Sequence, residues 1–321
     1  MQDVIHLRQR LSAQTRLCRL DQAVADAFPE YSRARLQSWI KSGELTVDGA
    51  TCKPKDKVGP GALIEIKATI VPISSGPEAI DLDVRYEDDA VVIVNKPAGL
   101  VVHPGAGNPA GTLMNAMLHY APETQALPRA GIIHRLDKDT SGLLMMGKTI
   151  TAVTDLSRQL AARTIKREYE ALVYGRPAPA GVVDAPIGRH PKHRTKMAIQ
   201  DEGRVAETRF WVIDTFEQTS HLRFDLVTGR THQIRVHMEH IGHPLIGDPV
   251  YRRRRGGPVE GLPDIGRQAL HARRLTFSHP ISKEEISVEA AAPADFLALL
   301  EWVKTANDRS GDRSSRAFWS A

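Results

Sequence analysis

The stretch HRLDKDTSG, residues 134–142, is the segment on which the predictions of fold and function depend. It places a histidine, an arginine, a lysine and two aspartates within nine positions. It has no helical or strand periodicity and directly precedes the apolar run LLMM. A surface turn held by ion pairs would have this composition. A catalytic loop that keeps one carboxylate ionised against an anionic substrate would have it as well.

The composition is that of a folded protein with one large core, or with one large and one small domain. The chain has 321 residues, of which 41% are hydrophobic and 25% are charged. Its apolar runs are shorter than the ~20 residues that cross a bilayer, and its N-terminal residues lack the apolar core of a signal peptide. The two cysteines, Cys18 and Cys52, suit a reducing compartment. We therefore expect a cytoplasmic protein without a membrane segment.

The net charge of +5 permits a polyanionic partner without requiring one. Basic residues gather at KPKDK (53–57), RHPKHRTK (189–196) and RRRR (252–255). Each cluster alone is compatible with a solvated loop. Three clusters in one chain favour a nucleic-acid partner, and we expect the arginines at 252–255 to contact RNA.

Residues 17–75 predict a compact module after an N-terminal extension at 1–16. Apolar residues recur at helical spacing in 19–28 and in 31–43, and Ser32 is a suitable N-cap for the second helix. The pair Asp48-Gly49 is a strong signal for a hairpin turn, and GALIEIKA, which follows, alternates as a strand does. The module therefore predicts two helices, a hairpin and a closing strand.

This module resembles the S4 RNA-binding domain over RLDQAVADAFPEYSRARLQSWIKSGELTVDGATCKP, residues 19–54. Periodicity alone slightly favours an ordinary solvated face for Arg33, Arg35 and Lys41, since they lie outside the apolar stripe of the second helix. The resemblance instead implies that these three side chains face RNA phosphates.

Residues 76–306 form a larger predicted domain, preceded by a linker within 71–80 and followed by a polar, flexible tail at 307–321. Runs typical of strands and runs typical of helices do not alternate regularly along it. We therefore expect an α+β fold, with a mixed, largely antiparallel sheet and flanking helices, rather than a doubly wound parallel sheet.

Several familiar chemistries are not supported by the sequence. It contains neither a phosphate-binding G-x-x-x-x-G-K-[ST] loop nor a G-x-S-x-G nucleophile elbow, and GAGNPAG lacks the dinucleotide-binding spacing. His232, His237, His240 and His243 resemble a metal-binding set, but no cysteine accompanies them. Around the helix predicted here, with Ile234 inward, these histidines would not converge on one ion. We therefore expect no metal.

Two further stretches could carry chemistry together with the loop at 134–142. KREYEALVYG, residues 166–175, predicts a strand on which Tyr169 shares a face with apolar residues. In residues 227–251 a strand ends at a turn and a helix begins, with Arg235 beside its apolar stripe. Taken singly, Tyr169 and Arg235 are adequately explained as a core tyrosine and a solvated arginine.

Together these stretches resemble the RluA-type pseudouridine synthases. The resemblance is carried by GIIHRLDKDTSGLLMMGKT (131–149), REYEALVYG (167–175) and GRTHQIRVHMEHIGHPLIGDPVY (229–251). VNKPAGLVVHPGAG, residues 94–107, is similar to the opening motif of the family. The resemblance covers nearly the whole chain apart from the tail. With an S4-like module in front, the arrangement is most similar to members that act on large-subunit ribosomal RNA.

The resemblance implies a role for individual residues. The catalytic aspartate of the family corresponds to Asp137, its active-site tyrosine to Tyr169 and its buried basic residue to Arg235. Arg135 matches the residue that helps to displace the target base. Asp139 is expected to be a turn residue that bonds the loop backbone. The expected RNA-binding residues are Arg135, Arg33, Arg35, Lys41, His134 and Arg230.

The implied reaction breaks the N1–C1′ bond of uridine, rotates the uracil and forms a C5–C1′ bond. Atoms and oxidation state are conserved, so the reaction requires no cofactor. Asp137 would act as a nucleophile or as a base that removes a sugar proton, and the sequence leaves both routes open. An arginine within ~4–6 Å lowers a carboxylate pKa by roughly 1–3 units, so Arg235 is suited to keep Asp137 ionised. Tyr169 would stack against the flipped uracil.

The predicted function is therefore a cofactor-free RNA pseudouridine synthase that acts on large-subunit (23S-type) ribosomal RNA, free or in pre-ribosomal particles, as a monomer. An enzyme for tRNA or another RNA is the alternative within this class. From other classes, a non-catalytic RNA-binding ribosome-assembly factor would not need the trio of Asp137, Tyr169 and Arg235. A metal-dependent RNA hydrolase would need a ligand cluster that the sequence does not offer.

Overall fold

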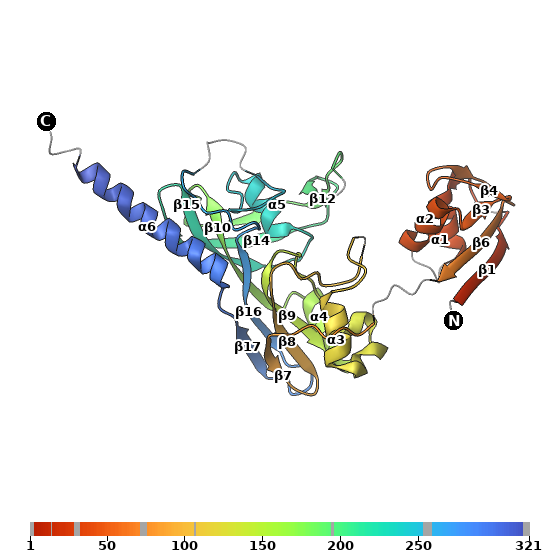
Figure 1. Cartoon of the computed structure of the whole chain (residues 1–321), viewed down its shortest axis with the longest axis horizontal. Helices are drawn as coiled ribbons and strands as arrows, with labels where there is room; N and C mark the ends of the chain where they lie inside the picture. The colour runs from red at the N-terminus through yellow and green to blue at the C-terminus, as the bar shows by residue number, and fades with distance from the viewer. Residues whose placement is uncertain are drawn as a thin grey trace. The chain divides into compact units, whose positions relative to one another are not determined.

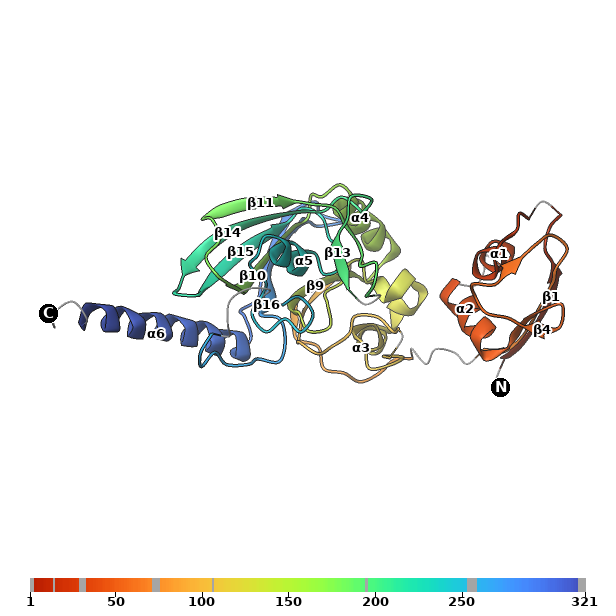
Figure 2. The same cartoon turned by 90° about the horizontal axis from the view of Figure 1, so that it is seen from above.

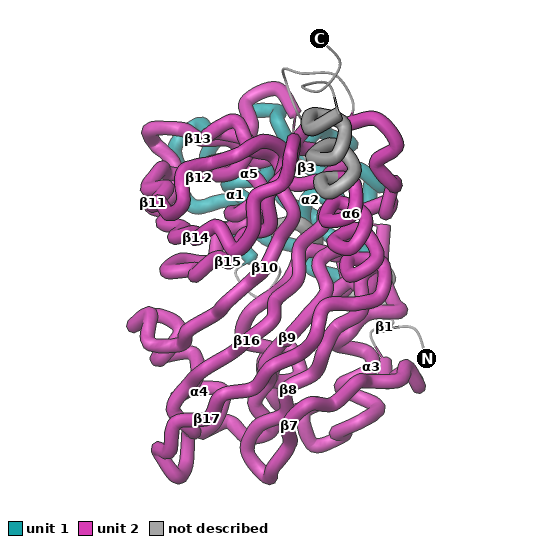
Figure 3. The backbone as a smooth tube through the Cα atoms, turned by 90° about the vertical axis from the view of Figure 1, so that its left-hand side faces the viewer, with its two compact units in different colours: residues 1–74 teal, residues 75–321 magenta. Residues whose placement is uncertain are grey.

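The computed structural model divides the chain into two compact units, residues 1–74 and 75–321 (Figure 3). The structure describes residues 3–13, 15–28, 33–70, 76–105, 107–193, 196–252 and 259–316. Within these ranges the side chains are described as well, except at 3–5, 33–35, 69–70 and 307–316.

The first unit is a four-stranded antiparallel sheet in the order β1-β6-β3-β4, with two helices packed on it. Leu36 and Ile40 of the second helix are buried against Ile64 and Ile66 of the sheet. The expected hairpin turn at Asp48-Gly49 is confirmed, since both residues have positive φ. The elements are β1 Asp3–Arg10, β2 Cys18–Arg19, α1 Leu20–Ala27, α2 Arg33–Ser42, β3 Leu45–Val47, β4 Ala50–Thr51, β5 Lys57–Val58 and β6 Leu63–Ile70.

Strand β1 lies in the segment that the sequence analysis assigned to an N-terminal extension. It pairs with β6 along its whole length, from Asp3 with Ile70 to Arg10 with Leu63. Leu7 packs against the core of the unit. The folded unit thus includes residues before position 17. Ser32 and residues 71–75 of the expected linker lie outside the described residues.

The second unit is built on a twisted nine-stranded sheet, which Figure 1 shows running through its centre. Neighbouring strands are antiparallel except β16 and β9, which are parallel, so the expected mixed, largely antiparallel α+β fold is confirmed. The elements are β7 Val84–Glu87, β8 Val91–Lys96, α3 Leu113–Tyr120, the 3₁₀ helices η1 Pro122–Ala126 and η2 Pro128–Gly131, β9 Ser141–Gly147, α4 Ile150–Ala161, β10 Lys166–Tyr174, β11 Ala180–Asp184, β12 Ile187–Arg189, β13 Met197–Ile199, β14 Glu207–Thr215, β15 Thr219–Leu226, α5 Gln233–His240, β16 Leu270–Ser278, β17 Glu285–Glu289 and α6 Ala294–Arg316.

Both faces of the central strands are buried, which explains their continuous apolar runs. On β8, Val92 and Val94 join the core under α3 and α5, whereas Val91 and Ile93 join the core under α4. Figure 2 shows α3 and α5 on one side of the sheet. Helix α6 covers a third cluster around Leu172 of β10.

Helix α6 extends further than the sequence suggested. Its backbone continues to Arg316, through much of the segment 307–321 that was expected to be a flexible tail. Residues 317–321 lie outside the described residues. Among the described helices, none is long and apolar enough to cross a membrane.

Candidate active site

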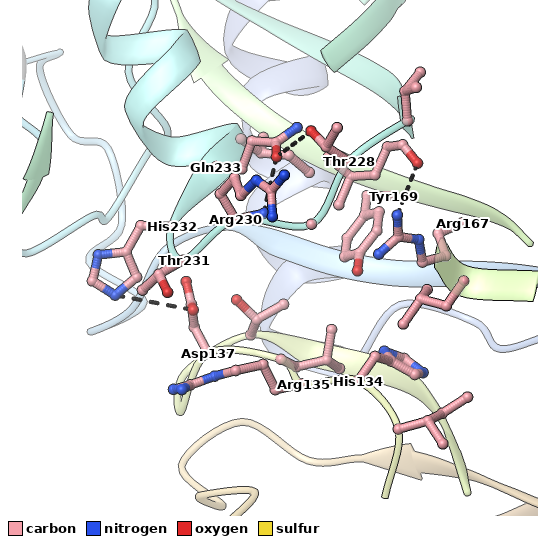
Figure 4. Close-up of a pocket in the computed structure, with 18 of the residues that line it drawn as sticks. His134, Arg135, Asp137, Arg167, Tyr169, Thr228, Arg230, Thr231, His232 and Gln233 are labelled. Atoms are coloured by element: carbon pink, nitrogen blue, oxygen red, sulfur yellow. Dashed lines mark hydrogen bonds and ion pairs between the residues drawn. The ribbon is translucent and has the colours of Figure 1, made fainter. Parts of the chain in front are cut away.

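A pocket of about 490 Å³ opens on the α5 side of the large sheet (Figure 4). The structure brings together there the three stretches that the sequence analysis singled out. Asp137 lies on the loop before β9, Tyr169 on β10 and Arg235 in the first turn of α5, and all three line the pocket. The pocket is in the range of size typical of small-molecule sites.

The loop that carries Asp137 is held in place by the strands around it. The backbone N–H of Thr140 donates to the Asp137 carbonyl at 3.1 Å, which closes the turn. The ammonium of Lys96, at the end of β8, donates to the carbonyl of Lys138 at 2.9 Å. At Gly142, where φ is +116°, a Cβ would lie 2.3 Å from the carbonyl oxygen of Ala272, so only glycine fits between β9 and β16 here.

Asp137 forms an ion pair with Arg235, in which Nη1 donates to the aspartate Oδ2 at 3.0 Å. The Arg235 side chain is 5% exposed and that of Asp137 is 17% exposed, so the pair is largely shielded from water while the carboxylate still faces the pocket. The pairing expected from the sequence is therefore confirmed. A shielded pair of this kind keeps the carboxylate in one orientation.

A second carboxylate, which the sequence analysis did not single out, fixes Arg235 from the other side. Asp248 is fully buried and accepts hydrogen bonds from Nε and Nη2 of Arg235, at 2.6 and 2.9 Å. Burial alone would lower the pKa of the Arg235 guanidinium, but the hydrogen bonds and charges of Asp248 and Asp137 raise it overall. Arg235 thus remains a cation between two carboxylates.

His232 lies on the other side of Asp137, with its Nε2 4.0 Å from the aspartate Oδ1. Its Nδ1 is 2.9 Å from the hydroxyl of Tyr251, which itself accepts the backbone N–H of Met197. Burial lowers the pKa of His232, although the Asp137 charge opposes this. A neutral ring that accepts the Tyr251 proton at Nδ1 carries its own proton on Nε2, toward Asp137.

Tyr169 forms part of the pocket wall and is 5% exposed. It packs on the same core face as Ala171 and Val173, as the alternation along β10 predicted. The register of β10 against β16 shifts between Glu168 and Tyr169, which marks a β-bulge next to the site. Burial raises the pKa of the Tyr169 hydroxyl, so the side chain stays a neutral phenol.

The other pocket residues predicted to bind RNA differ in how accessible they are. Arg135 is exposed beside Asp137 in Figure 4. Arg230 lines the pocket while its Nε donates to the Val205 carbonyl at 3.0 Å. His134 accepts the backbone N–H of Met145 through Nε2, and burial lowers its pKa to about 3. His134 thus secures the loop to β9 as a neutral ring.

The residues predicted to bind RNA outside the pocket lie partly beyond the described structure. Lys41 is exposed in the last turn of α2. Arg33 and Arg35 lie in the first turn of the same helix, but their side chains are outside the described part. Of the four arginines at 252–255, only Arg252 is described, and its Nε donates to the Pro249 carbonyl.

The expectation for Asp139 is wrong in its detail. Its backbone carbonyl accepts a hydrogen bond from Arg267 at 3.2 Å. Within the described ranges its carboxylate has no hydrogen bond to the loop backbone, because the turn is closed by Thr140 and Asp137 instead.

The histidines of the α5 region make separate structural contacts. His237 lies between Thr208 Oγ1 and the Ala185 carbonyl, at 2.9 and 3.0 Å, and His243 contacts the Tyr174 carbonyl. Across the residues that the structure describes, no group of three or more potential ligands could hold a metal ion.

Comparison with known proteins agrees with the geometry of the pocket. Residues 90–240 match the family model described as RNA pseudouridylate synthase, and residues 18–64 match the S4 domain. A relative in Pseudomonas aeruginosa, named ribosomal large subunit pseudouridine synthase D, is 49% identical over 294 residues, covering 89% of this chain and 92% of the relative. A relative of the same name in Nitrosomonas europaea is 51% identical over 290 residues, covering 89% and 84%.

A solved structure supports the same assignment. The protein titled human RNA pseudouridylate synthase domain containing 1 has a TM-score of 0.53 to this chain at 26% sequence identity. The match covers 67% of this chain and 85% of the human one. The resemblance inferred from the sequence motifs is thus confirmed over most of the chain. The chain belongs to the RNA pseudouridylate synthase family and carries an S4 domain at residues 18–64.

Proposed function

We propose that this protein converts specific uridines of large-subunit ribosomal RNA to pseudouridine, with Asp137 as the reacting carboxylate. The observation that carries this proposal is the ion pair between Asp137 and Arg235 at the wall of a pocket that also contains Tyr169. It supplies an oriented carboxylate, paired with a guanidinium, next to an aromatic ring, as the isomerisation of a flipped uridine requires.

The charge distribution of the pocket supports an RNA substrate. Asp137 is the only acid among the described residues that line it. Arg129, Arg135 and Arg163 are exposed at its edge. Cations in such positions attract phosphates and supply affinity that does not depend on sequence. Arg135, two positions before Asp137 in the chain, is proposed to fill the position that the flipped base leaves.

The chemistry assigns each group a role without a cofactor. Asp137 attacks C1′ or removes a proton from the sugar, and either route requires the carboxylate in its ionised form. Arg235 pairs with the carboxylate and fixes its orientation. The ring of Tyr169 stacks on the uracil, at a gain of ~1–3 kcal/mol that is comparable with the cost of flipping the base.

The substrate class is supported by the S4 domain and by the names of the relatives. Both relatives described above are named for the ribosomal large subunit. The exposed Lys41 on α2 and its neighbours Arg33 and Arg35 are proposed to contact RNA phosphates. The proposed setting is the cytoplasm, with the protein acting as a monomer on free or assembling ribosomal RNA.

The experiment uses the purified full-length protein with two unmodified substrates, a 23S rRNA transcript and a tRNA pool. Pseudouridines are mapped by carbodiimide-dependent stops in reverse transcription. New sites in the 23S transcript are expected with the wild type and none with Asp137→Asn. Modification of tRNA alone would refute the substrate assignment. RNA binding without any pseudouridine formation would favour an RNA-binding assembly factor and refute the catalytic proposal.

A further inference from the structure

Arg167, at the start of β10, is a buried cation with no carboxylate partner in the described structure. Its exposed fraction is 7%, and it lines the same pocket as Asp137 and Tyr169. Nη2 donates to the Leu226 carbonyl at 3.2 Å, whereas Nε is buried without any hydrogen-bond partner. Figure 4 shows the guanidinium at the wall of the pocket, on the same strand as Tyr169.

Such an arrangement is costly for the free protein. A guanidinium has five N–H donors, and a buried donor without an acceptor costs about 1–3 kcal/mol. Burial lowers the pKa of Arg167, and the neighbouring Tyr169 hydroxyl opposes this effect. A buried guanidinium with an unpartnered donor at a pocket wall is explained when a ligand supplies a further acceptor to the group.

The backbone at Gly229 lies close to the guanidinium of Arg167. A Cβ added at Gly229 would lie 2.6 Å from Nη1 of Arg167. The glycine of the turn before α5 therefore permits the close approach of the guanidinium to the backbone, and the carbonyl of Leu226 fixes one side of the fork. The position of Arg167 is thus built into the site.

Two parts of a bound nucleotide offer oxygen acceptors, the phosphate and the uracil ring. Exposed arginines at the pocket edge, such as Arg129 and Arg163, are accessible to phosphates, which remain near the surface where the strand enters and leaves. The flipped base penetrates deepest and is expected to contact Tyr169. Arg167 lies two residues from Tyr169 on the same strand and is as buried as the tyrosine. Because Arg167 is this deeply buried, the uracil ring is a better candidate than a phosphate for the acceptor that it contacts.

We propose that Arg167 donates hydrogen bonds to a carbonyl oxygen of the flipped uracil and stabilises the negative charge that the ring gains during the reaction. This inference rests on the proposed function and identifies the group that assists departure of the base. When N1–C1′ breaks, its electron pair passes to the ring and is shared by N1, O2 and O4. When C5–C1′ forms, the ring returns an electron pair through C5. Water or a base then takes the C5 proton and N1 takes up a proton, so the product is the neutral isomer. The charge exists only between these steps.

The experiment compares Arg167→Gln and Arg167→Lys with the wild type, in single-turnover reactions with the enzyme in saturating excess over the 23S transcript. We expect the rate for Arg167→Gln to fall about 10²–10³-fold, as it does when one donor to a developing oxyanion is removed. The Kd for RNA should stay within twofold, and Arg167→Lys should recover part of the rate. Gly229→Ala keeps the arginine but displaces Nη1, so it should lower the rate in the same direction. Arg209→Gln, an exposed arginine of β14 outside the pocket lining, is the matched control and should change neither quantity.

A transcript with 5-fluorouridine at the target position separates a chemical role from a structural one. Fluorine withdraws electrons from the ring, so the departing base carries its charge more easily and depends less on Arg167. For both nucleotides the rate is that of N1–C1′ cleavage, measured as loss of the starting nucleoside from digested RNA, because 5-fluorouridine has no C5 proton to lose. The defect of Arg167→Gln in this rate should be at least tenfold smaller with 5-fluorouridine than with uridine. A merely structural arginine would give equal defects and no rescue by lysine.

Three results would overturn the inference. An unchanged rate with a weaker Kd and a smaller dependence of binding on salt would assign Arg167 to a phosphate. Equal defects on both nucleotides with a lower melting temperature would make it structural. An inactive wild type would refute the proposed function together with this inference, whereas an active wild type with an unimpaired Arg167→Gln refutes this inference alone.

Discussion

Asp248 accepts hydrogen bonds from Nε and Nη2 of Arg235, at 2.6 and 2.9 Å, and this leaves Nη1 to reach Asp137. The Asp248 carboxylate is itself fixed, because its Oδ1 also accepts the backbone N–H groups of Val250 and Tyr251. The orientation of the reacting carboxylate thus depends on a series of contacts that begins at the turn of Asp248, Val250 and Tyr251. Asp248 is a positioning residue in this arrangement.

Asp248→Asn tests this series of contacts from Asp248 through Arg235 to Asp137. The amide keeps the size of the side chain, but its NH₂ group would face the N–H donors of Arg235 and leave a buried guanidinium with less compensation. Breaking a buried pair costs about 3–5 kcal/mol, which corresponds to a loss of about 10 °C in melting temperature. We also expect at least a tenfold lower single-turnover rate with an unchanged Kd for RNA. Asp264→Asn, an exposed aspartate that bonds only the turn at Gly266, is the control. Wild-type kinetics in Asp248→Asn would contradict the positioning role.

The two aspartates of the loop should behave differently. Asp137→Asn removes the charge that faces Arg235, so pseudouridine formation should fall below detection while RNA binding is retained within a factor of two. Asp139→Asn should keep most of the activity, because only the backbone carbonyl of Asp139 contacts a described neighbour through a hydrogen bond. Both variants are assayed by release of pseudouridine from digested RNA. An active Asp137→Asn, or an inactive Asp139→Asn, would show that the carboxylates are assigned the wrong way round.

The helices, strands and loops that carry the site were predicted well from the sequence. The side-chain contacts within the site were predicted less well. The loop at 134–142, the strand with Tyr169 and the helix with Arg235 were each found, because loops without periodicity and runs with clear periodicity are visible locally. The fold class followed from the irregular order of helices and strands. That β1 would pair with β6 was not visible, because strand pairing is a long-range property that local patterns do not encode.

Three charged residues of the site were missed for a common reason. Lys96, Arg167 and Asp248 are buried, and a single sequence gives no direct measure of burial. A weak signal exists for Lys96, which ends the apolar strand VVIVNK, where a charge is unexpected. Asp248 lies in a turn after α5, and its partner Arg235 is 13 positions earlier. Only the folded chain shows that these groups face one another.

The S4 unit has its own core, so its removal should leave the catalytic unit folded. Deletion of residues 1–75 should weaken binding to the 23S transcript at least tenfold, while the rate at saturating RNA stays within threefold. In the full-length chain, Lys41→Gln should reduce the salt slope of binding by about 1 if its ammonium contacts one phosphate. Affinity is measured by filter binding between 50 and 200 mM salt. Unchanged affinity and modified sites in the truncated protein would argue against an RNA-binding role for this unit.

Lys96 holds the catalytic loop through a hydrogen bond to its backbone, and its substitution should lower both the stability and the activity of the protein. It is 1% exposed, and its ammonium donates to the carbonyls of Pro97, Leu100 and Lys138, at 2.8, 3.0 and 2.9 Å. Lys96→Met leaves these partly buried carbonyls without their donor, at up to about 1–3 kcal/mol for each group. We expect a lower melting temperature and at least a tenfold lower single-turnover rate, since the loop at Lys138 adjoins Asp137. Lys138→Met, which removes an exposed side chain but keeps its carbonyl, is the matched control. A Lys96→Met variant with wild-type stability and rate would show that the loop does not need this support.

The lowered pKa of Lys96 predicts how the free energy of unfolding depends on pH. Burial lowers the pKa of Lys96 to about 7, partly opposed by Asp139 and Asp137, whereas an unfolded lysine titrates near 10.4. Between these values the unfolded chain binds more protons than the folded one, so the free energy of unfolding rises with pH, by up to ~1.4 kcal/mol per pH unit for this group. Below pH 7 both states bind the proton and the contribution is flat. Urea unfolding should therefore show that the free energy of unfolding of the wild type rises from pH 7 to 9 relative to that of Lys96→Met. Parallel curves would mean that Lys96 keeps its proton throughout this range and that the ammonium is stabilised by its three carbonyls.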